Sequence, residues 1–179
     1  MPELTLSWDS KPERKPWSTE LIKAVQAHLA DLEKGSPDQF IAGYSGLSAD
    51  RKILFWAELV VAMAKFESSW NPHNIFHEPP PLGVDSVGLL QLSYEDQPVY
   101  GLEPLSREQK SLEDPLVNIR CGVKILARLI SKDGVITKEV VVDGKRKFRG
   151  ASRYWSVLRE GTRHHLNEIK AMVKKATGL

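Results

Sequence analysis

The most constraining feature of this chain is the segment 53–66, in which nearly every position is apolar. Ser48 before it is a favourable N-cap residue, and Asn71-Pro72 after it are residues that stop a helix. A helix that is apolar on all sides is buried, and this one is too short to span a bilayer. We therefore expect one central, buried helix around which the rest of the chain packs.

A carboxylate, Glu67, follows the apolar segment at the last turn of this helix. It lies on one stripe with Trp56, Val60 and Met63, because these positions are separated by three or four residues. Burial and the negative end of the helix dipole both raise the pKa of a carboxyl group. Such a group stays protonated near neutral pH and can donate its proton, so Glu67 is a candidate general acid. The alternative is a frayed helix end with Glu67 in water, because glutamate is rarely buried without a partner.

Length and charge restrict the class of protein. The 179 residues suffice for one domain with a sizeable core, and 41% hydrophobic with 27% charged residues is ordinary for a globular protein. A formal net charge of +2 is no signature of nucleic-acid binding, although it is compatible with an anionic polymer such as a cell wall. Cys121 is the single cysteine, which excludes an intramolecular disulfide, and its place in an amphipathic segment favours a packing role over catalysis.

The N-terminal segment predicts an extended arm over residues 1–17, followed by a single domain over residues 18–179. The arm contains three prolines and mixed charge, and we expect its Trp8 and Trp17 to dock on the domain. It has no apolar core of a signal peptide, so the protein either remains inside the cell or has lost a leader. No stretch of the sequence is a candidate for a transmembrane span.

Hydrophobic spacing predicts several further helices. Asp114 with Pro115 marks a capped helix start, and the Ser36–Gln39 segment reads as a capping box. Val140–Val142, Asp143-Gly144 and the basic run after them predict a β-hairpin between residues 135 and 148. Its basic side chains either contact an anionic polymer or form a solvated edge. The expected helices cover residues 19–34, 37–43, 115 to about 134, 151–159 and 163–176.

Two loop motifs are candidates for chemistry. His73 and His77 have a spacing that binds metal only on a helix, and the prolines that follow argue against a helix, so we expect no metal site. Gly88 allows close approach of the backbone, and the Gln91 amide can hold a carboxyl group or a sugar amide. The alternative is a packing glycine and a surface glutamine. His164-His165 has no evident partner and is expected at the surface.

Three motifs, in order, resemble those of the soluble lytic transglycosylases, which share a fold with the goose-type lysozymes. The resemblance extends from about residue 50 to 160. Its motifs are Phe66-Glu67-Ser68 with Asn71-Pro72, then Ser86-Val87-Gly88-Leu89-Leu90-Gln91, and then Leu112-Glu113-Asp114-Pro115 with Asn118-Ile119 and Gly122.

The resemblance implies a mainly α, lysozyme-like domain with a small β-hairpin, whose cleft binds the glycan strands of peptidoglycan. It implies that Glu67 protonates the oxygen between N-acetylmuramic acid and N-acetylglucosamine and then accepts a proton from the muramic C6 hydroxyl, which closes a 1,6-anhydro ring. It also implies that Tyr154 holds Glu67 by a hydrogen bond. The residues that would bind substrate are Ser68, Ser86, Gly88, Gln91 and Tyr154. We expect no cofactor, a monomer, and a periplasmic or secreted protein, or one delivered by a phage.

The sequence also departs from the family pattern. Leu90 stands for the usual methionine, Trp155 stands where asparagine is expected, and the 135–148 hairpin is an insertion that narrows or extends the cleft. Ser93 stands where goose-type lysozymes carry an aspartate, which favours a one-carboxylate transglycosylase over a hydrolase. Asp85 and Asp96 lie nearby and could hold a hydrolytic water. An inactive wall-binding module and an unrelated helical scaffold are the remaining alternatives.

Overall fold

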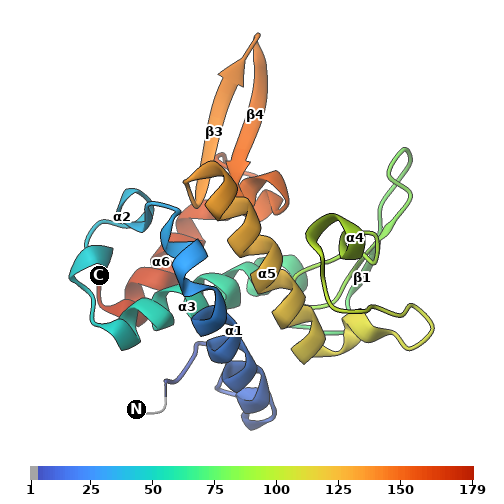
Figure 1. Ribbon diagram of the computed structural model, residues 1–179, viewed down its shortest axis with the longest axis horizontal. Coiled ribbons are helices and arrows are strands. Elements are labelled where there is room, and N and C mark those ends of the chain that lie inside the picture. Colours follow the sequence, from blue (N-terminus) through green and yellow to red (C-terminus); the bar gives the residue numbers. More distant parts are fainter. Residues whose placement is uncertain (1–3) are drawn as a thin grey trace.

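The computed structural model describes residues 4–179, and its helices surround one central helix, α3 (Figure 1). Helix α3 covers Ala49–Ser68, and the Ser48 Oγ accepts a hydrogen bond from the Arg51 backbone N–H at its start (3.4 Å). Every residue from 55 to 64 is at most 1% exposed. The predicted buried helix and its N-cap are therefore confirmed, since an all-round apolar helix needs cover on every side.

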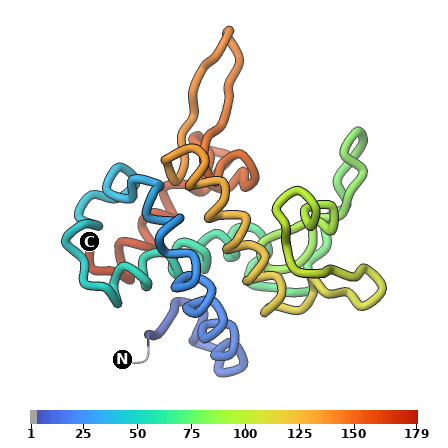
Figure 2. Tube along the Cα trace, in the orientation of Figure 1, coloured from blue at the N-terminus to red at the C-terminus, as the bar shows by residue number. Residues whose placement is uncertain are grey.

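Two long helices pack directly on α3, and a third packs on one of them. Helix α1 (Lys15–Glu33) packs on both α3 and α5 (Pro115–Asp133), and α6 (Leu166–Thr177) packs on α3. Helix α6 brings the C-terminus back to the start of α3, where the Arg51 guanidinium donates to the Thr177 carbonyl (3.5 Å; Figure 2). Two short helices, α2 (Pro37–Phe40) and α4 (Asp96–Tyr100), lie in the connections. Within residues 4–179, no helix has both the length and the apolar character to cross a membrane.

Two antiparallel hairpins complete the fold, which is mainly α as predicted. Strands β3 (Thr137–Val142) and β4 (Lys145–Gly150) form the predicted hairpin, with positive φ at both Asp143 (51°) and Gly144 (69°), as a two-residue turn requires. Strands β1 (Ile75–His77) and β2 (Asp85–Val87) form a second hairpin in a segment that the sequence predicts as loop. Its pairing is long-range within a polar, proline-containing stretch, so no local alternation reveals it.

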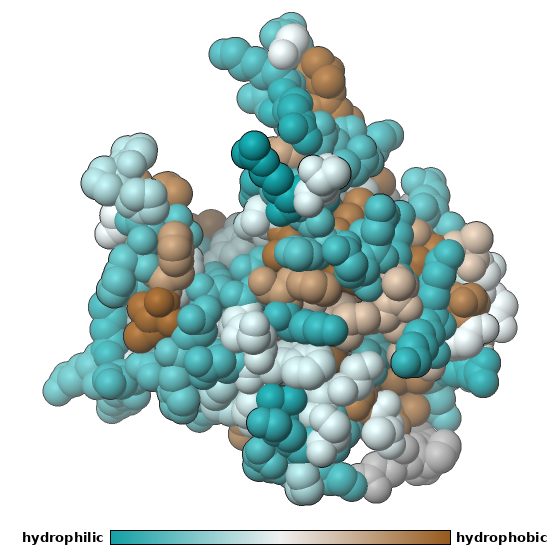
Figure 3. All heavy atoms as spheres, turned by 180° about the vertical axis from the view of Figure 1, so that it is seen from behind, coloured by the Kyte–Doolittle hydropathy of each residue, from teal (hydrophilic) through white to brown (hydrophobic). Residues whose placement is uncertain are grey.

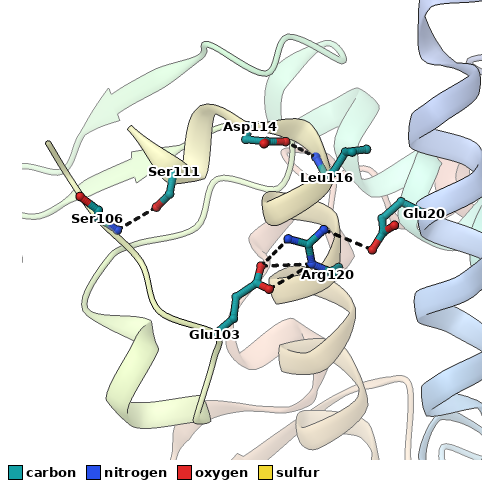
Figure 4. Close-up of polar contacts among 7 residues, drawn as sticks. All are labelled: Glu20, Glu103, Ser106, Ser111, Asp114, Leu116 and Arg120. Carbon is teal, nitrogen blue, oxygen red and sulfur yellow. Dashed lines mark hydrogen bonds and ion pairs between the residues drawn. The ribbon is translucent and has the colours of Figure 1, made fainter. Parts of the chain in front are cut away.

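Helix α5 and the lobe before it are held by polar contacts (Figure 4). The Asp114 carboxylate accepts from the Leu116 backbone N–H (2.8 Å), so the predicted N-cap is confirmed. The Arg120 guanidinium donates to Glu103 (2.8 Å) and to Glu20 (3.2 Å). One arginine therefore ties α5 to the connection after α4 and to α1. A 3-10 turn, Ser111–Glu113, precedes the cap.

The N-terminal segment differs from the predicted extended arm. A 3-10 turn, Pro12–Arg14, leads directly into α1 at Lys15, so the helix begins four residues before the predicted Thr19. Ser18 lies inside the helix, where its Oγ accepts from the Trp8 indole N–H (2.7 Å). Trp8 is fully buried and meets Trp17 edge to face at 5.6 Å, which confirms that both tryptophans dock. The first three residues of the predicted arm, including Pro2, lie outside the described residues.

A buried carboxylate fixes this arm to α3. Glu58 is 1% exposed in the middle of the apolar helix, and it accepts hydrogen bonds from the backbone N–H and the Oγ of Ser7 (both 2.8 Å). Burial raises the pKa of Glu58, and the Ser7 bonds oppose that rise. Within the buried stretch 55–64 of the central helix, Glu58 is therefore the one charged residue, and it holds the arm.

Two further local predictions are wrong. Ser36 has positive φ (51°) and its Oγ donates to the Gly134 carbonyl (3.1 Å) instead of capping α2, which ends at Phe40. The predicted helix over residues 151–159 is two 3-10 turns, Ala151–Arg153 and Ser156–Leu158. Trp155 between them is extended, because its buried indole N–H donates to the Leu90 carbonyl (2.9 Å) and sets the local backbone.

Candidate active site

Helix α3 ends in a way that presents Glu67 beside the β2 strand. Ser69 and Trp70 have positive φ (54° and 59°), which stops the helix one residue after Ser68. The Trp70 indole N–H donates to the Val61 carbonyl (2.8 Å), and the buried Ser68 Oγ donates to the Leu89 carbonyl (2.9 Å). The last turn of α3 is thus fixed from both sides.

Glu67 lies in a cleft with a volume of about 450 Å³. The β1–β2 hairpin forms one wall, and the turn that follows β4 forms the other. Figure 3 shows the two hairpin lobes rising on either side of a hollow in the surface. The lining residues are Glu67, Asn74, Phe76, Glu78, Leu82, Val84, Ser86, Gln91, Ser93, Asp96, Tyr154, Trp155 and Ser156.

The environment of Glu67 favours its neutral form. Burial raises the pKa of its carboxyl to about 7, the Glu78 carboxylate adds to the rise, and the Arg159 guanidinium opposes it. Within residues 4–179, no side chain or backbone group forms a hydrogen bond or ion pair with this carboxyl. The predicted half-buried carboxylic acid with a raised pKa is confirmed, and the alternative of a solvated, frayed helix end is wrong. Its catalytic role stays a prediction.

Three of the five predicted binding residues line the cleft with Glu67, and two do not. Ser86, Gln91 and Tyr154 are part of the wall. Ser68 is 7% exposed and bonded to Leu89, behind the wall. Gly88 has positive φ (80°), and a Cβ there would lie 2.4 Å from both the Leu112 carbonyl and the Asn118 amide. Gly88 therefore has the packing role that was its alternative interpretation.

Asn118 organises the segment that carries these wall residues. It is fully buried on α5, its Nδ2 donates to the carbonyls of Val87 and Leu112 (both 2.9 Å), and its Oδ1 accepts from the Leu90 N–H (3.0 Å). Gly122, one turn later, gives Leu90 room, since a Cβ at this glycine would lie 2.2 Å from that side chain. Gly122 therefore marks a close approach of α5 to the loop that carries Leu90.

Gln91 closes the same segment at the cleft. Its backbone has positive φ (51°), and its Nε2 donates to the carbonyls of Asn74 and Gly88 (both 3.0 Å). The side chain thereby joins the residue before β1 to the segment that follows β2. Among the described residues, no donor satisfies the Gln91 Oε1, so this oxygen can accept a hydrogen bond from a ligand.

The predicted hydrogen bond between Tyr154 and Glu67 is wrong. The Tyr154 hydroxyl donates to Asp96, which also accepts from the Ser93 backbone N–H (2.9 Å). Burial and the Asp96 carboxylate raise the pKa of Tyr154, and burial also raises the pKa of Asp96. Asp85, the other aspartate considered for a water, pairs with His77 (2.6 Å) and is not a lining residue.

His73 and His77 are not among the residues that line the cleft. His73 contacts Glu113 (3.0 Å) and His77 contacts Asp85, so the two side chains have different carboxylate partners. In the part of the chain that the structure describes, no group of three or more potential ligands is placed to hold a metal ion. His165, expected to be without a partner, stacks on Phe66 (4.2 Å between centroids).

Comparisons with known proteins identify the family of this chain. The family model of the transglycosylase SLT domain matches residues 48–142, more than half of the chain. The chain belongs to this family. No curated protein matches.

Solved structures support the assignment over almost the whole chain. Bd0314 DslA, wild-type form 2, is 33% identical, with 98% of each chain covered and a TM-score of 0.83. Two glutamate-to-glutamine variants of Bd0314 DslA match over the same share of each chain, at 32% identity with a TM-score of 0.83 and at 31% with 0.75. The SLT family accounts for the lysozyme-like fold and excludes the alternative of an unrelated helical scaffold.

Two charged residues that act on Glu67 in this SLT domain were missed in the sequence: Glu78, which lines the cleft, and Arg159, which is not a lining residue. Glu78 lies at the end of β1, where its backbone N–H donates to the Val84 carbonyl (2.9 Å) and its carboxylate accepts from the Ser86 Oγ (3.2 Å). The glutamates substituted in the two DslA variants are eleven positions apart, the same separation as Glu67 and Glu78. Only the unpredicted β1–β2 hairpin brings Glu78 to the cleft.

Arg159 contributes a positive charge beside Glu67. Its guanidinium lies over the Phe148 ring of β4 (4.1 Å to the centroid), and its Nε donates to the Ser152 carbonyl (3.1 Å). Burial lowers the pKa of Arg159. Since this charge opposes protonation of Glu67, it keeps the pKa of the acid near neutrality rather than higher.

The charge of Arg159 gives a test that needs no enzymatic assay. We expect an NMR titration of the Glu67 carboxyl carbon to give a pKa of about 7, and Arg159→Gln to move it upward, because the opposing cation is removed. Arg163→Gln, at an exposed arginine in the same segment before α6, is the matched control and should leave the pKa of Glu67 unchanged. A Glu67 midpoint near 4.5 in the wild-type protein would contradict the buried-acid interpretation.

Proposed function

We propose that this protein is a peptidoglycan lytic transglycosylase that cleaves the bond between N-acetylmuramic acid and N-acetylglucosamine. The observation that carries the proposal is Glu67, an unpaired and half-buried carboxylic acid with a pKa of about 7 in a cleft of an SLT domain. An acid of this pKa keeps a substantial protonated fraction at neutral pH and still transfers the proton readily.

In the proposed reaction, protonated Glu67 gives its proton to the glycosidic oxygen as the bond to muramic C1 breaks. The resulting Glu67 carboxylate then takes the proton of the muramic C6 hydroxyl, and O6 forms a new bond to C1. The acid returns to its protonated state and no water is consumed. Arg159 assists the middle of this cycle, because its charge stabilises the carboxylate that exists between the two proton transfers.

The cleft walls supply groups suited to hold the sugars. Gln91 Oε1 and the Asn74 side chain offer amide groups, and the exposed Phe76 and Leu82 offer apolar surface. Tyr154 acts through Asp96 to fix the far wall rather than by contact with the acid. Because its substrate lies outside the cytoplasm, we propose a periplasmic or secreted site of action, as a monomer.

Hydrolysis is a second candidate, favoured by one observation. Glu78 provides a second carboxylate in the cleft with Glu67, and hydrolysing glycosidases use two carboxylates, one as acid and one as base or nucleophile. Ser93 stands where a goose-type lysozyme carries an aspartate, so in a hydrolase Glu78 or Asp96 would have to act as the second carboxylate.

Mass analysis of the muropeptides released from purified sacculi distinguishes these reactions. We expect products with 1,6-anhydromuramyl ends, because the muramic C6 hydroxyl replaces water as the nucleophile. Reducing muramyl ends would show a hydrolase. Binding to sacculi without release of any product would show an inactive wall-binding module.

A further inference from the structure

The β3–β4 hairpin has two faces of opposite character. It projects from the helical body (Figure 1), and its register pairs Lys138 with Arg149, Val140 with Lys147 and Val142 with Lys145. Paired residues lie on the same face of a two-stranded ribbon, and alternate positions along a strand share that face. One face therefore carries four cations and two valines, and no carboxylate. We call it the basic face, and its cations are Lys138, Lys145, Lys147 and Arg149.

The cations of the basic face are free of ion-pair partners, with one exception. The ammonium groups of Lys138, Lys145 and Lys147 form no hydrogen bond or ion pair with another residue in the range 4–179. Arg149 at the base influences Asp133, whose pKa it helps to lower. On the opposite face, Arg146 is bonded to Glu139, so that face is neutralised. The structure thus leaves its unpaired hairpin charge on one side.

The hairpin adjoins the cleft through its own chain. Strand β4 leads within a few residues to Tyr154–Ser156, which form one cleft wall. Arg159 lies over Phe148 on the neutralised face of the same hairpin and its charge acts on Glu67, so the base of the hairpin is close to the cleft. Figure 3 shows the hairpin rising beside the hollow, with hydrophilic atoms along one of its edges and hydrophobic atoms along the other.

We propose that the basic face binds carboxylate groups on the peptide stems of the peptidoglycan strand held in the cleft. The inference rests on the proposed function, because the cleft is what brings the polymer to the hairpin. Peptide stems repeat along the glycan and carry carboxylates, so several weak ion pairs act on one polymer. A single exposed ion pair contributes little to the binding free energy. When several cations on one face bind several carboxylates of one polymer, their small contributions add together.

A solvated ribbon edge is the other interpretation, and charge reversal separates the two. Charges of either sign prevent strands from pairing at an exposed edge, so Lys145→Glu/Lys147→Glu would keep that protection. Only a site for anions requires positive charge. We expect the reversed variant to remain soluble and folded, with an unchanged Tm, and to lose affinity for sacculi.

The decisive measurement is co-sedimentation with purified sacculi in a Glu67→Gln background, which prevents turnover. Lys145→Gln/Lys147→Gln should weaken binding about fivefold at low salt. The loss should disappear on sacculi whose peptide stems were removed with an amidase, and it should shrink at high ionic strength. Lys174→Gln/Lys175→Gln, at two exposed lysines of α6, makes the same change in net charge and should bind like the parent.

Three results would overturn the proposal. They are unchanged binding of the hairpin variant, an equal loss in the α6 control, and an equal loss on stem-free sacculi. Binding of the parent to phosphatidylglycerol vesicles that depends on the hairpin lysines, with sacculus binding unaffected, would assign the face to a lipid surface instead. Muropeptide release by the wild-type protein is measured in a separate assay. Stem-dependent binding without any released product would refute the proposed function but would still support the binding role of the hairpin.

Discussion

Replacing Glu67 with glutamine is expected to lower the turnover of peptidoglycan about a thousandfold, because it removes the proton that the leaving oxygen requires. The glutamine side chain keeps the shape and polarity of the site, so substrate binding should change little. Release of soluble muropeptides from sacculi, followed at pH 6 to 8, measures the effect. Glu108→Gln, at an exposed glutamate in the connection after α4, is the matched control and should retain full activity.

The same substitution is expected to make the protein more stable above neutral pH. The pKa of Glu67 in the folded state, about 7, lies above its ordinary value of 4.5. As the pH rises, the unfolded chain therefore loses the Glu67 proton at a lower pH than the folded protein does. The neutral carboxyl contributes its full stabilisation below about pH 4.5, and this contribution is lost as the pH rises through about 7. In denaturant unfolding at pH 8, the Glu67→Gln variant should have a higher free energy of unfolding than the wild-type protein. An inactive variant that is also less stable would indicate a structural rather than a chemical loss.

Replacing Asn118 with alanine is expected to lower the free energy of unfolding by about 4 kcal/mol. The change leaves the Leu112 carbonyl and the Leu90 N–H without partners and removes one of the two donors to the Val87 carbonyl. These groups belong to the segment that carries Ser86 and Gln91, so activity should fall with stability. Urea unfolding followed by circular dichroism measures the first effect and muropeptide release the second.

Two further variants define the cause. Asn118→Asp keeps the size and the acceptor but loses both donors and faces two carbonyls with a carboxylate. Its destabilisation should therefore be larger at pH 7 than at pH 4, where a protonated carboxyl regains one donor. Asn167→Ala, at an exposed asparagine of α6, should be neutral or slightly stabilising. An Asn118→Ala variant within 1 kcal/mol of wild type would show that these bonds are not what holds the cleft segment.

The cleft illustrates how one acid can be tuned by groups on other elements. Burial at the end of α3 raises the pKa of Glu67, Glu78 from the β1–β2 hairpin raises it further, and Arg159 from the C-terminal segment lowers it. The balance of these three effects, rather than burial alone, places the pKa near 7. The helix end provides the carboxyl, and two distant segments set its protonation.

Local signals were sufficient for the main elements. The apolar run predicts α3 and its burial, Asp114 with Pro115 predicts the start of α5, and Asp143-Gly144 predicts the turn between β3 and β4. Each of these depends on residues within a few positions of one another, through capping, side-chain spacing or turn geometry. The position of Glu67 at the end of a buried helix follows from the same kind of information.

Tertiary contacts decided the rest of the cleft. Tyr154 bonds Asp96 instead of Glu67, across 58 positions of the chain, and Trp155 bonds Leu90 across 65. The burial of Trp155 breaks a segment whose spacing predicts a helix. The bond between Glu58 and Ser7 in the core could not be predicted either. The sequence shows only one polar residue in an apolar run, and its partner Ser7 is 51 positions away.

The sequence by itself determined the buried helix, the acid at its end and the family to which these motifs belong. The tertiary structure alone decided that Glu78 faces the same cleft, that Arg159 restrains the pKa of the acid, and that the unpaired hairpin cations share one face. The physical reason is range: helix capping, turn geometry and apolar periodicity act between neighbours in the chain, whereas the electrostatic environment of a carboxyl depends on whatever the fold brings near it.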